Sequence, residues 1–122
     1  IKNVLNENPD ITSILNIGVK IAYFDYELAK HYSTHNFIGV DFMKRLVKFN
    51  SRYYISNLKL ISGYALELFE QGQIEADLVY FSSTATAIRN RELRKYLSLI
   101  RKTSKYIIFN EPLFTLPESK IF

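Results

Sequence analysis

The chain has 122 residues, enough for one domain, and its 48% hydrophobic content argues against a disordered chain. It contains no cysteine, which excludes disulfide frameworks, thiol catalysis and thiolate metal sites. The net charge of +4 is modest, and no apolar run approaches the roughly 20 residues of a membrane span, so we expect a soluble, cytoplasmic domain without membrane contact.

The first residue of the sequence and its two histidines each lead to one expectation. The sequence starts at Ile1 and its only methionine is Met43, so we expect residues 1–122 to be a single domain taken from a longer chain. His31 and His35 are the only imidazoles, and they fall at a helix end and in the following turn. An exposed histidine is ordinary there, and we expect no metal site.

The predicted elements alternate between strands and helices from the start of the chain. A polar lead-in over residues 1–12 turns at Pro9, and the mainly apolar run of residues 13–17, which lacks clean alternation, predicts a buried parallel strand. Apolar residues at helical spacing predict a helix over residues 22–33, and residues 37–41 predict a strand ending on Asp41. Further along we expect a helix with an apolar stripe of Phe42, Leu46, Phe49 and Tyr53, a strand over 57–62, a helix over 66–71 capped by Gly72, a strand over 76–81, a helix over 89–102, a strand over 106–109 and coil over 113–122.

This alternation predicts the fold class. Five strands joined through four helices give an α/β domain, a Rossmann-like three-layer α/β/α arrangement with a mainly parallel sheet. The fifth strand would form an open sheet edge, so we expect further C-terminal strands of the natural protein to be missing from this chain.

Positive charge gathers in two stretches. One holds Lys44, Arg45, Lys48, Arg52 and Lys59 without an acid, and the other holds Arg89, Arg91, Arg94, Lys95, Arg101, Lys102 and Lys105 with Glu92 alone opposing them. We interpret both as solvated helix faces, with a nucleic-acid surface as the alternative.

Gly18 and Asp41 form the pattern that points to function. The first predicted strand delivers Gly18 at its carboxyl end, and Asp41 closes the second strand 23 positions later. A glycine turn and a carboxylate at this separation are how α/β sheets build nucleotide pockets.

The order of these motifs over residues 13–112 resembles the class I S-adenosylmethionine-dependent methyltransferases. That family ends its first strand with acid-x-Gly-x-Gly-x-Gly, and this chain has Asn16-Ile17-Gly18-Val19-Lys20-Ile21-Ala22. Gly18 is kept, Asn16 can replace the acid as an acceptor, and Ala22 is a small substitute for the last glycine. Lys20 replaces the middle glycine, where the cofactor's methionine moiety approaches the backbone closely.

The later landmarks match in part. Asp41, followed by Phe42, matches the acid that holds the ribose hydroxyls, and Gly63-Tyr64-Ala65 stands where the family often has Gly-Asp-Ala, so that Tyr64 could stack on or bond to adenine. Ser82-Ser83-Thr84 lacks the Pro-Pro-aromatic motif of amino-group methyltransferases, which favours an oxygen or small-molecule acceptor. The resemblance implies S-adenosylmethionine as cofactor, held by Asn16, Gly18, Val19, Asp41, Phe42, Tyr64, Ala65 and Ser82, with Glu111 as the catalytic base.

Other interpretations stay open. A nicotinamide-binding Rossmann domain would need small residues at positions 18, 20 and 23, and Lys20 and Tyr23 fail. A methyltransferase-like scaffold that has lost its cofactor is favoured by Lys20 and Tyr64. Gly18 could be a plain turn, Asp41 a helix cap, Ser82 a turn residue and Glu111 a solvated loop residue. We expect a small-molecule substrate as partner, and the sequence does not predict an oligomeric state.

Overall fold

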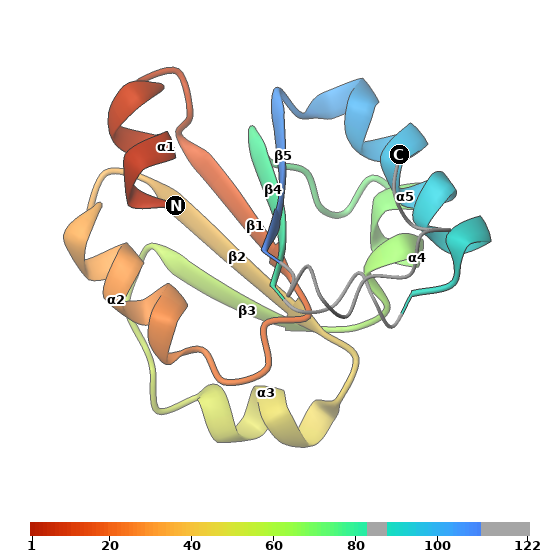
Figure 1. Cartoon of the computed structure of the whole chain (residues 1–122). Helices are drawn as coiled ribbons and strands as arrows, with labels where there is room; N and C mark the ends of the chain where they lie inside the picture. Colours follow the sequence, from red (N-terminus) through yellow and green to blue (C-terminus); the bar gives the residue numbers. More distant parts are fainter. Residues whose placement is uncertain (83–87, 111–122) are drawn as a thin grey trace.

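The fold was obtained as a computed structural model, which describes residues 1–82 and 88–110 (Figure 1). The helices are α1 (Lys2–Glu7), α2 (Tyr23–His31), α3 (Lys44–Asn50), α4 (Ala65–Glu70) and α5 (Asn90–Thr103). The strands are β1 (Ser13–Ile17), β2 (Asn36–Asp41), β3 (Leu58–Ser62), β4 (Leu78–Ser82) and β5 (Tyr106–Asn110).

The sheet has the strand order β3-β2-β1-β4-β5, and every pairing among the described strands is parallel. Ile17, at the carboxyl end of β1, lies opposite Val40 of β2 on one side and Phe81 of β4 on the other. The chain builds outward from β1 to β3 and then crosses to β4, so the strand order reverses between β1 and β4. Ligands of open α/β sheets bind outside the carboxyl ends of the strands at such a reversal.

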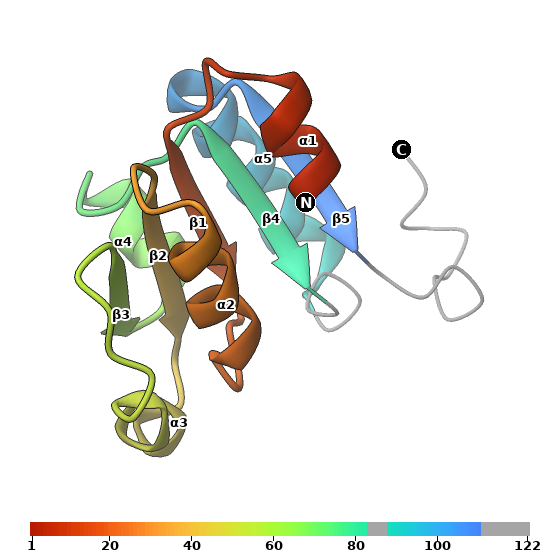
Figure 2. The ribbon, with the colours of Figure 1, turned by 90° about the vertical axis from the view of Figure 1, so that its left-hand side faces the viewer.

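Helices cover both faces of the sheet (Figure 2). On one face, Leu15 and Ile17 of β1 pack with Phe69 of α4 and with Leu93 and Ile100 of α5. The alternate residues of β1 point the other way, where Ile14 packs with Leu5 of α1 and Leu28 of α2. This division follows from the two-residue period of a strand, and it confirms the expected three-layer arrangement.

The helix ends explain several boundaries. The amides of Gly72 and Gln73 donate to the carbonyls of Phe69 and Leu68, and Gly72 has a φ of +67°, so α4 ends in the glycine cap that the sequence predicts. The side-chain amide of Asn57, expected to begin the third strand, instead lies within hydrogen-bonding distance of carbonyls at the end of α2 and of the His35 carbonyl just before β2. The polar lead-in contains the short helix α1, which ends before the turn at Pro9.

The expected apolar stripe on the third helix is wrong as a core-facing stripe. Helix α3 begins only at Lys44, Phe42 is 73% exposed, and Phe49 is exposed as well. Among the side chains of α3 that the structure describes, the fully buried one is Asn50, a polar side chain that binds the backbone of another loop. Within the described residues, no helix is long and apolar enough to cross a bilayer. The predicted coil over residues 113–122 lies outside the described residues.

Candidate functional site

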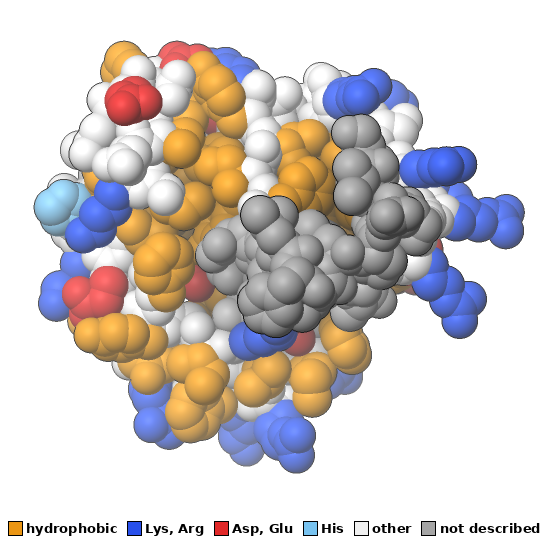
Figure 3. Space-filling view, viewed as in Figure 1, with side chains coloured by type: hydrophobic (Ala, Val, Ile, Leu, Met, Phe, Trp, Pro, Cys, Tyr) orange, Lys and Arg blue, Asp and Glu red, His pale blue; other side chains and the backbone are white. Residues whose placement is uncertain are grey.

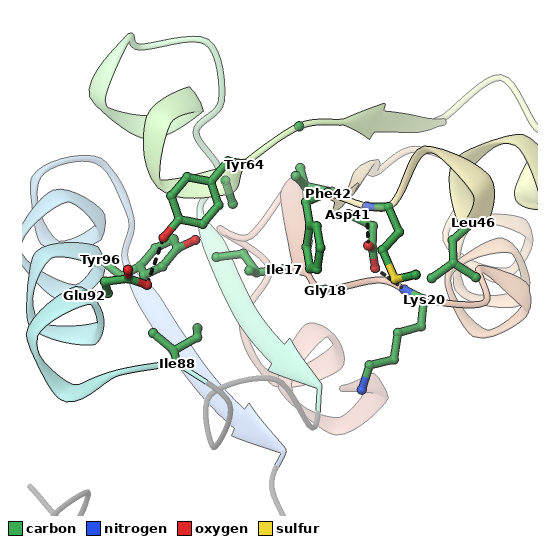
Figure 4. A pocket seen from close by; sticks show the side chains of 14 residues that line it. Ile17, Gly18, Lys20, Asp41, Phe42, Leu46, Tyr64, Ile88, Glu92 and Tyr96 are labelled. Carbon is green, nitrogen blue, oxygen red and sulfur yellow. Dashed lines mark hydrogen bonds between the residues drawn. The ribbon is translucent and has the colours of Figure 1, made fainter.

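A cavity of about 310 Å³ opens at the carboxyl ends of β1, β2 and β3 (Figure 4). Helix α5 closes it on the side away from α3. Its walls are mostly apolar, with carboxylates at two places. It is lined by Ile17, Gly18, Lys20, Val40, Asp41, Phe42, Met43, Leu46, Gly63, Tyr64, Ala65, Ile88, Glu92 and Tyr96.

The loop after β1 is held in a turned conformation by the backbone of β2. The amides of Gly18 and Val19 both donate to the carbonyl of Val40, at 2.9 and 3.2 Å. Gly18 has a φ of +76° and Lys20 a φ of +53°, the left-handed region in which a side chain normally costs about 1–2 kcal/mol. The loop thus keeps the shape that a glycine would take at position 20, although a lysine stands there.

Asp41 joins this loop to the loop after β2. Its side chain is buried, with 5% exposed, and its two oxygens accept from the backbone amides of Lys20 and Met43, each at 3.0 Å. The bond to Met43 is an Asx-type turn two residues ahead, so Asp41 shapes the entry to α3 while lining the cavity. A carboxylate has about four lone-pair sites, and two remain to accept further donors such as vicinal hydroxyls.

Asn50 supports the same loop from α3. Its side-chain oxygen accepts from the amide of Ala22 at 2.9 Å, and its side-chain amide donates to the carbonyl of Lys20. Sequence reasoning missed Asn50, because an asparagine at the end of a basic helix looks like an ordinary surface residue. The sequence feature that could have identified Asn50 is its helical spacing. It lies four residues after Leu46 and so shares the side of α3 that faces the protein.

Tyr64 and Glu92 form the second polar end of the cavity. The Tyr64 hydroxyl donates to a Glu92 carboxylate oxygen at 2.8 Å, which joins the loop after β3 to the first turn of α5. Partial burial and the neighbouring Glu92 raise the pKa of Tyr64 above its usual value, so this hydroxyl stays protonated and donating. Figure 4 shows the pair facing Phe42 across the cavity.

Asn16 points to the opposite face of the sheet. Its side-chain amide donates to both oxygens of Asp25 on α2, at 3.0 and 3.1 Å, and the Tyr80 hydroxyl donates to the same carboxylate at 3.0 Å. Burial raises the pKa of Asp25 to about 6, and the bonds from Asn16 and Tyr80 oppose this rise. Asn16 therefore fixes α2 against β1, which supports the loop between them, and it does not line the cavity.

The predicted site residues divide accordingly. Gly18, Asp41, Phe42, Tyr64 and Ala65 line one cavity, although they come from the carboxyl ends of three different strands and the segments that follow them. Val19 is not among the lining residues and packs below Gly39, where an added Cβ would lie 3.0 Å from a Val19 methyl.

For Ser82 and Glu111 the structure does not describe the side chain, and Lys20 points away from the centre of the cavity. Ser82 is the last residue of β4, with its side chain outside the described part, as is Glu111. Figure 4 shows the Lys20 side chain extending away from the space between Phe42 and Tyr64. Among the described residues, no three His, Asp or Glu side chains cluster as metal ligands would.

The strand order, the parallel sheet and the cavity beyond β1 and β2 are those of the class I S-adenosylmethionine-dependent methyltransferase fold. Solved structures with this fold match the chain closely in shape. PKMT2 from Rickettsia typhi, in complex with AdoHcy, matches with a TM-score of 0.68 at 19% identity over 78% of this chain and 19% of its own.

Two further structures match over similar lengths. CalS10, a SAM-bound amino pentose methyltransferase from Micromonospora echinaspora, gives a TM-score of 0.71 at 12% identity over 91% of this chain and 47% of its own. The Haemonchus contortus phosphoethanolamine N-methyltransferase 1, with phosphoethanolamine and S-adenosylhomocysteine, gives 0.65 at 21% identity over 81% and 22%. This chain therefore spans less than two thirds of the length of these structures. No family model and no curated protein matches the sequence.

Proposed function

We propose that this chain is the cofactor-binding part of an S-adenosylmethionine-dependent methyltransferase that acts on an oxygen or other small-molecule acceptor. The observation that carries the proposal is the buried Asp41 carboxylate, held by two backbone amides at the mouth of a cavity of about 310 Å³. The similar structures with bound cofactor or product support the same choice of ligand.

The cavity fits an adenosyl group in chemistry. Asp41 offers free lone pairs to a pair of ribose hydroxyls, and the apolar walls from Ile17, Phe42 and Ile88 suit the faces of a purine. Glu92, which accepts from Tyr64, can accept from an exocyclic amine with its remaining lone pairs. Because Gly18 has no side chain, the space at its turn stays open and a ligand can approach the backbone closely.

Bound S-adenosylmethionine would supply an activated methyl group on a sulfonium. This chain would hold and orient the cofactor. Asp41 would fix the ribose, and Phe42 and Ile88 would exclude water. The loop of residues 18–22, braced by Asn50, would limit the directions from which an acceptor can approach the methyl group. We propose Glu111 as the base that takes a proton from an acceptor hydroxyl, because in the sequence it directly follows Asn110, the last residue of β5, and the carboxyl end of β5 lies at the same edge of the sheet as the cavity. The sequence Ser82-Ser83-Thr84, which begins at the last residue of β4, lacks the Pro-Pro-aromatic motif and so favours an oxygen over an amine acceptor.

Calorimetric titration of the chain with S-adenosylmethionine and S-adenosylhomocysteine tests the cofactor. We expect saturable binding that Asp41→Asn weakens at least tenfold, because the amide group cannot accept from two ribose hydroxyls while it also holds two backbone amides. Asp77→Asn is the matched control, since Asp77 binds the amides of Thr12 and Ser13 at the opposite end of the sheet. An equal loss of cofactor affinity in both variants would mean that Asp41 does not contact the cofactor.

The competing function is a scaffold with a methyltransferase fold and no cofactor. Lys20 favours it, because it is a side chain at positive φ where the family has glycine. No heat and no thermal shift at millimolar ligand would decide for the scaffold. If the cofactor binds, methyl transfer to hydroxyl-bearing and amine-bearing small molecules, compared side by side, tests the acceptor.

A further inference from the structure

Exposed aromatic and apolar side chains concentrate on one part of the surface. Seven of the nine exposed large hydrophobic residues in the described part of the chain lie at the start of α2 or around α3. With four cations they form what we call the aromatic–cationic face, which comprises Ile21, Tyr23, Phe24, Phe42, Met43, Phe49, Tyr54, Lys44, Arg45, Lys48 and Arg52. Figure 3 shows orange side chains interspersed with blue ones over these two helices.

The two segments that make up the face are joined to each other. The ring of Tyr53 lies between those of Tyr23 and Tyr26, with centroids 6.0 and 5.9 Å away. Asn50 bonds the end of α3 to the amide of Ala22 just before α2. The face is therefore held in one arrangement by contacts on its inner side, while its outer side chains stay in solvent.

The charge on this face has one sign. Residues 42–66 contain no Asp or Glu, and Lys44, Arg45, Lys48 and Arg52 are all exposed. Neither ion pair seen among the described residues, Glu27 with Lys30 and Asp10 with Lys105, uses these cations. A surface with four cations and no acid is complementary to a polyanion.

Cations and rings share the same side of α3. Arg45 and Phe49 are neighbours on α3 at i and i+4, and Arg52, two residues past the end of the helix, places its guanidinium 4.0 Å from the centroid of the Phe49 ring. Tyr54, which is 82% exposed, lies in the segment that follows α3.

We propose that the aromatic–cationic face binds single-stranded nucleic acid. Arg45, Lys48 and Arg52 would contact phosphates, and unpaired bases would stack on Tyr54 and on the Arg52–Phe49 stack. A single strand is favoured over a duplex because paired bases hide their faces in the helix, and exposed rings gain nothing from them. Helix α5, the other basic helix, presents no exposed large hydrophobic side chain and is not part of this site.

This proposal does not depend on cofactor binding, because the residues assigned to the strand lie outside the cavity. From the sequence alone, the basic stretch that begins at Lys44 is interpreted as a solvated helix face. A nucleic-acid site replaces that interpretation for this stretch alone. The sequence showed the charges, but only the structure shows that Phe49 stays in solvent beside them.

Fluorescence anisotropy of the chain with labelled dodecamers of uridine and of thymidine tests the proposal. We expect binding that weakens with salt, and a salt slope reduced by about 1.4 in the Arg45→Ala/Arg52→Ala variant, from two phosphate contacts on a single strand. Arg94→Ala/Arg101→Ala on α5 is the charge-matched control and should keep the wild-type slope. Tyr54→Ala should weaken binding by about tenfold, and Tyr54→Phe, which keeps the ring, by less than about twofold.

Thermal melting of each variant confirms that a loss of binding is not a loss of folding. A preference for either the uridine or the thymidine strand supports the proposal and identifies the kind of strand. Equal effects of the two arginine pairs, equal affinity for a duplex of the same length, or no effect of Tyr54→Ala would overturn it. So would association with phosphatidylserine vesicles in the absence of any oligonucleotide binding.

Discussion

Asp25 should make this domain less stable as pH rises from mildly acidic to neutral. Its carboxyl group is buried on α2, with 3% exposed, and burial raises its pKa from 3.8 to about 6. In the unfolded chain the group ionises near 3.8, so between the two values the folded state binds the proton more tightly. Stability from this group is thus fully present only below the unfolded-state pKa of 3.8, and it is lost as pH rises from there through about 6.

The size of the effect follows from the shift. A rise from 3.8 to about 6 corresponds to about 3 kcal/mol at neutral pH, since one pKa unit is 1.36 kcal/mol. Part of this is already lost at pH 4, which leaves about 2 kcal/mol between pH 4 and pH 7. This change is a large fraction of the 5–15 kcal/mol that typically separates a folded domain from its unfolded chain.

The Asp25→Asn variant isolates this contribution, because asparagine has a similar shape and no charged form. Urea unfolding followed by far-UV circular dichroism at pH 4, 5, 6 and 7 gives the free energy of unfolding of both proteins. We expect the variant minus wild-type difference to rise by about 2 kcal/mol over this range, whatever offset the altered bonds to Asn16 and Tyr80 add.

Asp77→Asn is a control with the opposite sign. Backbone amides, first that of Thr12, lower the pKa of Asp77, so its stabilisation is present above about pH 4 and is lost as pH falls. A difference for Asp25→Asn that stays flat from pH 4 to pH 7 would refute the reasoning. It would mean that the bonds from Asn16 and Tyr80 outweigh burial.

Three further changes test the cavity and the loops around it. Glu92→Gln should reduce the preference for S-adenosylhomocysteine over its inosine analogue from at least tenfold to near unity in calorimetry, because a glutamine amide can either accept from an amine or donate to a carbonyl, whereas a carboxylate can only accept. If the variant kept the wild-type preference, Glu92 would not contact the purine, but the cofactor assignment would be unaffected. Asn50→Ala should lower the free energy of unfolding by about 2–3 kcal/mol in urea, because it leaves the amide of Ala22 and the carbonyl of Lys20 unpaired in the interior. Wild-type stability would mean that water replaces these bonds. Gly39→Ala should lower the melting temperature, since its Cβ would lie 2.9 Å from a Leu60 methyl, whereas Gly72→Ala at an open position tests φ strain alone.

The sequence was sufficient for the architecture because each element carries a local signal. Apolar runs without alternation marked strands with two covered faces, and the spacing of Leu93, Tyr96 and Ile100 marked α5. The order of these elements, with the right-handed connections of parallel strands, left few topologies to consider. Gly18 and Asp41 could be assigned to one edge for the same reason, since carboxyl ends of parallel strands share an edge.

The direction of individual side chains could not be predicted in the same way. Asn16 and Ile17 are neighbours in the sequence, yet one binds Asp25 under α2 and the other lines the cavity, because alternate residues of a strand face opposite sides. Phe42 and Phe49 have the spacing of a buried stripe, but α3 lies past the end of the sheet and has little core to face.

By itself, the sequence determined the order of strands and helices, the parallel sheet and the edge on which a site would lie, since these follow from local periodicity and from the connections between elements. Only the tertiary structure decided which distant polar groups meet: Asp41 with the amide of Lys20, Tyr64 with Glu92, and Asn50 with the loop before α2. Each of these contacts joins residues from different loops or elements. Their geometry depends on how the layers pack, and no short-range pattern in the chain records it.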